Sequence, residues 1–362
     1  MANYKAFGLA APLLGEIMLF LPPVNRPDLE TFASILPRTG KIVLCTHRHP
    51  DPDGLGAIVG IGHLLKKKFD IDTDLVLEGR IRRAENITMR DLLNIEAMPE
   101  GGVDPANYAG MIVVDSQPCF SHTPLPVGIP LLAVFDHHDG ITDEGAEPIP
   151  FEWVDSGFGA TSTMVYELLK HYDVQPDKRT ATALFCGVRY DTNNLLRGAT
   201  PADEEAFRTL ELNADRQVIG AIDQPPLSRE YFKQMHRGIN ACEDYGTLLL
   251  TLMDEVISPE SVAEIADWFL RLEGQQWSLA GGSCDGLYQV SLRCDMPGAD
   301  AYPALRHILG EKGACGGHGR MAGGQIELGE MSIDEVKMYI KSRTLEYLSL
   351  SDIEVQSLSA ND

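Results

Sequence analysis

The chain has 362 residues, of which 44% are hydrophobic and 23% charged, and these values are typical of a soluble globular protein with two domains. Its 53 acidic and 30 basic residues give a formal net charge of −23. This balance argues against a protein that coats long nucleic acid, because neutralising many phosphates needs a surplus of Lys and Arg. It leaves open a small phosphate substrate that is held by a few local cations.

The seven cysteines are odd in number and form no CxxC pair. A zinc ribbon or a disulfide framework is therefore not expected. This cysteine usage favours a reducing compartment, so we expect a cytoplasmic protein.

Residues 1–37 are expected to form an N-terminal apolar extension. Its apolar run, residues 7–21, contains Pro12 and Glu16 and is shorter than the roughly 20 residues of a membrane helix. We expect no membrane span, and only Lys5 precedes the run, so a signal peptide is the weaker alternative. The preferred interpretation is a short helix that packs on the body of the protein or on a partner, and a homodimer contact is left open.

Short apolar runs alternate with helical patterns from residue 41 onward. Strands are expected at 41–47, 73–79, 110–116 and 130–138, helices at 56–69 and 160–172, and a helix or a strand at 180–192. Such runs predict an α/β domain over residues 38–215, with a parallel sheet covered on both faces. Ligands of such sheets bind just outside the carboxyl ends of the strands.

The remaining chain predicts a second, smaller α/β domain at 236–350, after a linker at 216–235 that contains a Pro pair. Its expected elements are strands at 246–255 and 287–295 and helices at 259–272 and 332–350. The tail 351–362 is expected to fray.

The segment HRHPDPDGLGA (47–57) places His47, Asp51 and Asp53 close together at a strand end. Residues two apart share a face in an extended backbone, so the two carboxylates are expected to approach one cluster together. Gly54 and Gly56 are expected to let the backbone turn into the following helix.

Three further segment ends carry acidic or imidazole side chains. They are VVDS with Asp115, FDHH with Asp136, His137 and His138, and GVRYDT with Asp191. One such aspartate alone is often a turn former or a helix cap, whereas four segment ends together favour a site. Carboxylates with some imidazole suit Mn²⁺ or Mg²⁺ better than Zn²⁺, and two such ions can clamp a phosphoryl displacement.

These four motifs, in this order, resemble the DHH phosphoesterases, a family named for the triplet that stands here at 136–138. The Gly-rich segment GGHGRMAGG (316–324) is similar to the signature of the family's second, DHH-associated (DHHA1-type) domain. The resemblance covers residues 38–345. It implies two α/β domains, an N-terminal parallel-sheet domain and a smaller C-terminal domain, with the active site in the cleft.

The resemblance also implies roles for individual residues. One ion would take His47, Asp51 and Asp115, and the other would take Asp53, Asp115, His137 and Asp191. Asp115 would bridge the two ions, Asp136 would orient an imidazole, and His138 would assist the leaving group. The substrate's other phosphate would be held by Arg293, Gly316, Gly317, His318, Arg320 and Gly323. Solvation at the surface is an equal alternative for Arg320.

Two departures from the family pattern bear on the site. Ala57 stands where the family commonly has Ser, which is expected to affect packing or a cap. His49 is an extra imidazole beside His47, and the spacing to Asp51 favours His47 as the ligand.

Within the family, the two-domain size resembles the nano-RNase/pAp-phosphatase group, which degrades very short oligonucleotides and dephosphorylates pAp. The implied function is hydrolysis of short nucleotides such as pApA or pAp by a hydroxide that bridges two Mn²⁺ ions, with Mg²⁺ or Co²⁺ as alternatives. Other functions left open are an inorganic pyrophosphatase or polyphosphatase, a cyclic-dinucleotide phosphodiesterase, and an inactive nucleotide sensor.

Overall fold

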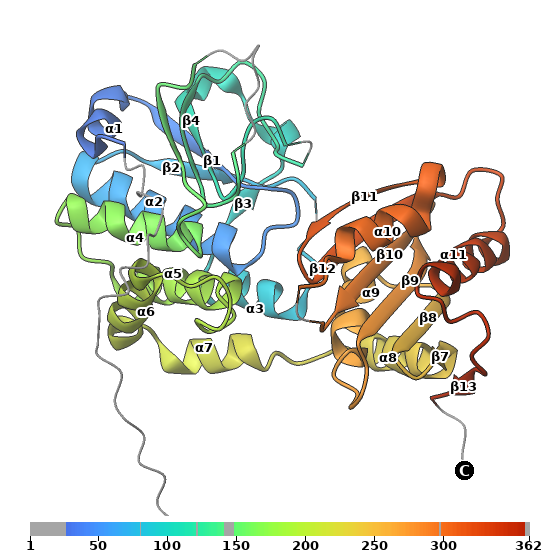
Figure 1. The fold of residues 1–362 in the computed structure, drawn as a ribbon. Helices are drawn as coiled ribbons and strands as arrows, with labels where there is room; N and C mark the ends of the chain where they lie inside the picture. Colours follow the sequence, from blue (N-terminus) through green and yellow to red (C-terminus); the bar gives the residue numbers. More distant parts are fainter. Residues whose placement is uncertain (1–26, 80, 121, 141–147, 297, 359–362) are drawn as a thin grey trace, which may run out of the picture. The chain divides into compact units, whose positions relative to one another are not determined.

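The computed structural model describes residues 27–358 except 80, 121, 141–147 and 297, and it divides into two compact units (Figure 1). The first unit runs to Ile81 and continues over Thr88–Asp223, and the second combines Arg82–Ile87 with the described residues from Gln224 onward. Most of the predicted N-terminal extension, residues 1–26, lies outside the described residues, as do residues 359–362 of the predicted tail. The side chain of His318 also lies outside them.

The first unit contains a parallel six-stranded sheet in the order β3-β2-β1-β4-β5-β6. Its strands are β1 (Lys41–Cys45), β2 (Thr73–Val76), β3 (Ala97–Met98), β4 (Tyr108–Val114), β5 (Leu131–Asp136) and β6 (Phe151–Val154). The α/β class with a parallel N-terminal sheet is therefore confirmed. The short strands β3 and β6 had no distinct signal in the sequence.

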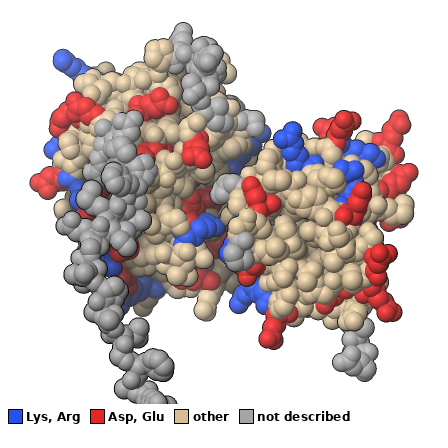
Figure 2. Space-filling model, in the orientation of Figure 1, with Lys and Arg blue, Asp and Glu red and all other residues tan. Residues whose placement is uncertain are grey.

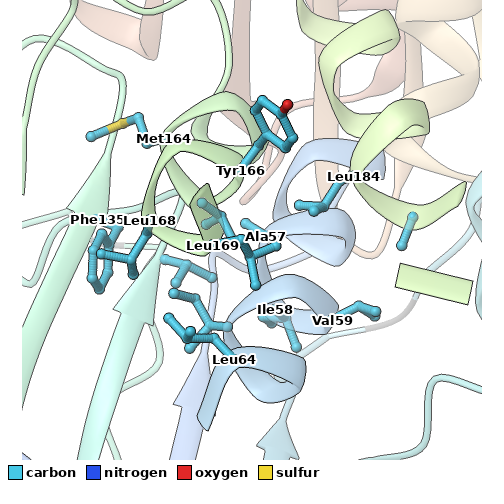
Figure 3. Packing of buried hydrophobic residues seen from close by; sticks show 14 of the residues in the cluster. Ala57, Ile58, Val59, Leu64, Phe135, Met164, Tyr166, Leu168, Leu169 and Leu184 are labelled. Carbon is cyan, nitrogen blue, oxygen red and sulfur yellow. The ribbon is translucent and has the colours of Figure 1, made fainter. Parts of the chain in front are cut away.

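Both faces of this sheet are buried, which explains the continuous apolar runs of its strands. On β1, Ile42 and Leu44 belong to one hydrophobic cluster, while Val43 and Cys45 belong to another. The first cluster includes residues of the helices, as Figure 3 shows for α2, α4 and α5. The second is completed by residues of connecting segments, such as Val103. Both faces are covered as predicted, but the helices contribute only to the first cluster.

Three helices of this part of the chain, α2 (Pro52–Phe69), α4 (Thr161–His171) and α5 (Lys178–Asp191), overlap predicted segments. The others are α1 (Leu29–Ile35), α6 (Pro201–Asn213), α7 (Arg216–Asp223) and α3 (Ala84–Leu92), whose first residues belong to the second unit, with short 3₁₀ turns η1 (Glu100–Gly102) and η2 (Pro105–Asn107). The segment predicted as a helix or a strand is the helix α5. The helix expected from residue 56 begins at Pro52, because proline suits a first helical turn and Asp51 caps it.

The order in which strands are added to the sheet changes side between β1 and β4. From β1 the chain adds β2 and β3 on one side, and it then returns to add β4, β5 and β6 on the other side. The segments after β1 and β4 therefore leave neighbouring strands at the same edge of the sheet. This is a topological switch point, where α/β sheets bind their ligands.

The second unit contains a seven-stranded sheet in the order β11-β12-β10-β9-β8-β7-β13, antiparallel except for the pair β8/β9. Its strands are β7 (Cys242–Asp244), β8 (Leu248–Glu255), β9 (Trp277–Cys284), β10 (Leu287–Cys294), β11 (Gly313–His318), β12 (Met321–Glu327) and β13 (Gln356–Ser357). Its helices are α8 (Arg229–Ala241), α9 (Pro259–Phe269), α10 (Ala301–Leu309), the 3₁₀ turn η3 (Gly310–Lys312) and α11 (Ile333–Tyr347). The segment 216–235, expected as a linker, contains α7 and the start of α8.

Each face of the second sheet packs against its own helices. Leu248 and Leu250 of β8 share a cluster with residues of α10 and α11, whereas Leu249 shares one with residues of α9. The Gly-rich segment 316–324 belongs to the hairpin of β11 and β12.

Over the described residues, no helix is long and apolar enough to cross a membrane. Acidic and basic side chains are interspersed on the face shown in Figure 2. Acidic side chains on that face therefore have basic side chains among them.

Candidate metal centre

Asp51 and Asp53 lie at the start of α2 in different backbone conformations. Asp51 is extended and caps the helix, since its Oδ1 accepts hydrogen bonds from the N–H groups of Asp53 (2.9 Å) and Gly54 (3.2 Å). Asp53 is already in the first helical turn and is fully buried. The expectation that both residues share a face of an extended strand was therefore wrong, because the helix starts earlier.

Asp115 follows β4 and lies between two histidines from other segments. Its Oδ2 is 3.5 Å from His47 Nε2, and its Oδ1 is 3.7 Å from His137 Nε2. Its φ of 54° is in the left-handed region, which is uncommon for a residue other than glycine but several-fold enriched in Asp and Asn. With one oxygen toward each histidine, this buried carboxylate can serve two cations.

Three groups of possible ligand atoms lie at this site, and one of them, Asp115 with His137 and His138, shares residues with the other two. His47, Asp51 and Asp115 make the first, and Asp53, His137 and Asp191 make the second, with the atoms of each group within 4.8 Å of one another. In the second group, His137 Nε2 lies 2.9 Å from Asp191 Oδ2 and 4.0 Å from Asp53 Oδ2. The structure thus brings together all six residues that the sequence singled out as ligands.

Both histidines present the same nitrogen to the carboxylates. His47 Nδ1 lies 2.9 Å from the carbonyl of Arg48, and His137 Nδ1 lies 3.4 Å from the carbonyl of Phe158. Because a carbonyl only accepts, Nδ1 is the donor in each pair, so a ring in its neutral form keeps a lone pair on Nε2. This orientation is the usual one for histidines that bind metals.

Two further observations show that cations fit here. His137 Nε2 is buried among carboxylates, and although Asp191 Oδ2 lies 2.9 Å away, the geometry with the described residues is not that of a hydrogen bond. A Cβ atom at Gly54 would lie 2.6 Å from Thr46 Oγ1 and 3.1 Å from Asp115 Oδ2, so only glycine keeps this space open. Gly54 therefore leaves room inside the site and does not serve as a backbone turn as predicted. A hard oxygen-rich site with some imidazole suits Mn²⁺ or Mg²⁺.

The electrostatics of the site favour added positive charge. Burial and the nearby Asp191 raise the pKa of Asp53 to about 7, and burial together with Asp53 and Asp51 raises the pKa of Asp115 well above its usual value. Burial alone would lower the pKa of His137, but the proximity of Asp191, Asp115 and Asp53 raises it well above its usual value. These directions have one cause, an excess of buried negative charge that protons or divalent cations can compensate.

The start of α4, which no predicted site residue marked, supports the ligands. The N–H groups of Thr161 (2.7 Å) and Ser162 (2.8 Å) donate to Asp53, and Thr161 Oγ1 donates to Asp115 Oδ1 (3.1 Å). The N-terminus of a helix favours carboxylates in this way. The available signal was the Thr-Ser pair at the start of a predicted helix.

Asp136 orients His138, as the family resemblance implied. Asp136 Oδ1 is 2.8 Å from His138 Nδ1, and Gln117 Nε2 donates to Asp136 Oδ2 over 2.7 Å. Burial would raise the pKa of Asp136, but the hydrogen bonds from His138 and Gln117 lower it. His138 Nδ1 also lies 4.0 Å from Asp115 Oδ1, but its bond to Asp136 occupies that nitrogen and leaves Nε2 for a substrate.

The two departures from the family pattern lie beside the site. The ring of His49 faces Gly79, and the possible metal groups of the described residues contain His47 and not His49. Ala57 is fully buried inside α2, where it contributes to packing.

The predicted substrate-binding arginines of the second unit are paired with acidic residues. Arg293 Nε donates to Asp267 on α9, and Arg293 NH1 donates to Ser291 Oγ over 2.7 Å. Arg320 NH1 donates to Asp295 over 2.5 Å. An anion would therefore compete with a carboxylate for either guanidinium group.

The glycines of the hairpin lie beside a groove of about 440 Å³ over β10, β11 and β12, next to α9. Gly316 and Gly323 are paired across the hairpin and line this groove, and a Cβ atom on either would meet nothing within 4 Å. Gly317 has a φ of 145° and lies against Met321 and Ala322, so its requirement for glycine is conformational and steric. The backbone of His318 pairs with Met321.

Comparison with known proteins gives a family match that lies mainly in the first unit. Residues 41–188 match the model of the DHH family, N-terminal domain. This stretch of the chain is therefore similar to that domain. The matched range includes five of the six candidate ligand residues and both residues of the Asp136–His138 pair. It ends three residues before the sixth, Asp191.

Two curated relatives share about a quarter of their aligned residues with the chain. The uncharacterized protein MJ1633 of Methanocaldococcus jannaschii is 26% identical over 316 residues, which are 87% of this chain and 64% of that protein. A probable manganese-dependent inorganic pyrophosphatase of Enterococcus faecalis is 26% identical over 153 residues, which are 42% of this chain and 48% of that protein. The chain thus spans less than two thirds of each relative.

Two solved structures show the same fold. An exopolyphosphatase-related protein from Bacteroides fragilis matches with a TM-score of 0.67 and 15% identity, over 86% of this chain and 97% of that one. RecJ from Thermus thermophilus in complex with Mn²⁺ matches with a TM-score of 0.53 and 16% identity, over 90% of this chain and 56% of that one. At these identities the likeness concerns the fold alone.

Proposed function

We propose that the chain is a phosphoesterase that depends on two divalent cations and hydrolyses phosphodiester or monoester bonds of short nucleotides. The observation that carries the proposal is Asp115, whose two oxygens face two separate groups of ligand atoms. Two adjacent cation sites with a shared carboxylate are the arrangement that two-metal phosphoryl transfer needs. Mn²⁺ is the proposed ion, with Mg²⁺ or Co²⁺ as alternatives, and the Mn²⁺ named for the pyrophosphatase relative and for RecJ supports it.

Different residues of the chain would bind the cations, orient the ligands and protonate the leaving group. Cations bound here would polarise the phosphoryl group and make water a better nucleophile. The two ligand groups hold those cations, and Thr161 and Ser162 fix the orientation of Asp53. His138, held by Asp136 through Nδ1, directs its exposed Nε2 to the leaving oxygen and can protonate it.

Short nucleotides are proposed as the substrate class for two reasons. The net charge of −23 disfavours a long polyanion but is compatible with a short one. The groove at Gly316 and Gly323 exposes backbone and leaves space for a group larger than phosphate. We propose that Arg293, Arg320 and the hairpin of residues 313–327, with Gly317 and His318, bind the part of the substrate that does not react.

A cytoplasmic location is part of the proposal. The seven cysteines form no disulfide, and three of them are buried in the two sheets, at Cys45, Cys242 and Cys294. Cysteines that remain thiols are usual in a reducing compartment.

Hydrolysis of inorganic pyrophosphate is a second candidate. It is favoured by the match to the probable manganese-dependent inorganic pyrophosphatase, which is 26% identical to this chain over 153 residues. Pyrophosphate has no organic part, so it leaves the groove of the second unit without a role.

The test is a parallel assay of the purified chain with Mn²⁺ on pApA, pAp, cyclic di-AMP, a long oligonucleotide and pyrophosphate. We expect the highest kcat/KM on pApA or pAp, and no turnover by Asp191→Ala on any substrate. Preference for pyrophosphate would replace the first proposal by the second. Turnover by Asp191→Ala at the wild-type rate would contradict the metal site itself.

A further inference from the structure

The ligands of the metal centre depend on one short stretch of backbone, residues 158–162. Its amides at Thr161 and Ser162 hold Asp53, and the hydroxyl of Thr161 holds Asp115. The carbonyl of Phe158 lies 3.4 Å from His137 Nδ1. A small displacement of this stretch would therefore move three ligands at once.

Asp203 on α6 anchors this stretch from behind. It is fully buried, and its Oδ2 accepts from the N–H of Gly159 (2.9 Å) while its Oδ1 accepts from Thr163 Oγ1 (2.6 Å). A Cβ atom at Gly159 would lie 2.8 Å from Asp203 Oδ2 and 2.8 Å from Thr192 Cγ2. The contact is thus close enough that only glycine fits.

The same carboxylate also holds the segment that follows Asp191. The N–H (2.8 Å) and the hydroxyl (2.7 Å) of Thr200 both donate to Asp203 Oδ2. Residues 192–200 therefore run from the last ligand to an anchor on Asp203. One buried side chain connects the stretch that orients Asp53, Asp115 and His137 with the segment that follows Asp191.

Helix capping explains only part of this arrangement. Thr200 and Asp203 form the capping box of α6, as Ser332 and Glu335 do for α11. The carboxylate of Glu335 is exposed and receives hydrogen bonds from Ser332. Asp203, by contrast, is buried and accepts additional bonds from Gly159 and Thr163, which capping does not require.

We infer that Asp203 is a positioning residue that sets the affinity of the centre for divalent cations through residues 158–162. The inference rests on the proposed function, because it assumes that the two ligand groups bind cations. The physical reason is preorganisation, since carboxylates held in place lose less freedom when a cation binds.

The experiment compares Asp203→Asn with Glu335→Gln in the full-length protein. Each substitution removes the charge of a capping box and keeps the side-chain shape. The dissociation constant for Mn²⁺ is measured by calorimetry and by the electron paramagnetic resonance of free Mn²⁺, and stability is measured by urea unfolding without metal. We expect Asp203→Asn to weaken Mn²⁺ binding about tenfold, the lower end of the range for groups that orient ligands. Glu335→Gln is expected to bind Mn²⁺ as the wild type does.

Thr163→Val and Thr163→Ser give a second, milder pair. Val removes the hydroxyl that donates to Asp203 Oδ1, whereas Ser keeps it, so only Thr163→Val should weaken Mn²⁺ binding. If Asp203→Asn does not fold, this pair decides the question. Equal Mn²⁺ affinity of the variants and the wild type would overturn the inference alone. A wild type that binds no Mn²⁺ would overturn the proposed function and the inference with it.

Discussion

The two sheets of this protein differ in how they create a binding surface. In the first unit, charged side chains converge at the carboxyl edge of a parallel sheet, and burial together with neighbouring carboxylates raises the pKa of Asp53 and Asp115. In the second unit, side chains are missing at Gly316 and Gly323, so the strands themselves form the floor of a groove. The first surface carries an excess of buried negative charge that protons or divalent cations can compensate, whereas the second provides room. We therefore expect the two surfaces to respond differently to mutation and to metal.

The largest effect is expected for Asp115→Ala. Because Asp115 belongs to the first group and its Oδ1 lies 3.7 Å from His137 Nε2 of the second, its loss should abolish hydrolysis and the binding of Mn²⁺ together. The metal-free variant should still unfold cooperatively, since the substitution relieves repulsion among buried carboxylates. Circular dichroism and urea unfolding check the fold, and calorimetry checks Mn²⁺ binding. Residual binding with wild-type stoichiometry would show that the two groups do not depend on a common residue.

His138→Ala should separate catalysis from metal binding within the first unit. A lost general acid typically lowers kcat by about 10²–10⁴-fold, and Mn²⁺ affinity should not change because His138 Nδ1 is bound to Asp136. The measurement is kcat on pApA at saturating Mn²⁺, with calorimetry alongside. A matched drop in Mn²⁺ affinity would instead make His138 a ligand.

Addition of Mn²⁺ should stabilise the first unit selectively. At about 100 times the dissociation constant, a ligand that binds only the native state contributes about 2.7 kcal/mol. Hydrogen exchange should slow at residues 51–54, 115–117 and 158–162 and stay the same in β10 and β12. Equal slowing in both sheets would contradict the assignment of the cations to the first unit.

The smallest effect is expected for Gly323→Val, which fills the groove of the second unit. The position has an ordinary φ and open space above it, so a β-branched residue should be tolerated by the strand. We expect KM for a nucleotide to rise by about an order of magnitude, or about 1.4 kcal/mol, with little change in kcat or Mn²⁺ affinity. Glu327→Val, on the same face of β12 but outside the groove, is the control. An unchanged KM would remove the groove from the substrate site.

The sequence predicted the metal centre better than the surface of the second unit. The ligands of the first unit follow strands or begin and end helices, so local patterns marked them. Arg293, by contrast, was predicted as a phosphate ligand, and the structure pairs it with Asp267, 26 residues away along the chain. A residue's partner across such a distance leaves no periodic signal. The role of Asp203 was invisible for the same reason, since Gly159 lies 44 residues from it.

One error in the predicted elements had a local cause. Asp53 was predicted to be extended, but Pro52 is the first residue of α2, so Asp53 is helical. The glycines of residues 316–324 stand in two paired strands, β11 and β12, and β12 also pairs with β10. Glycine content alone does not separate a loop from a strand.

The sequence by itself determined the α/β class, four strands of the first sheet and the identity of six ionisable residues at segment ends. Only the tertiary structure decided that Asp115 directs one oxygen to each histidine, that His137 Nε2 is buried among carboxylates, and that the start of α4 supports the ligands. The physical reason is the switch point between β1 and β4. Sheet topology, which is set by burial of the whole core, brings to one edge residues that the chain separates by more than a hundred positions.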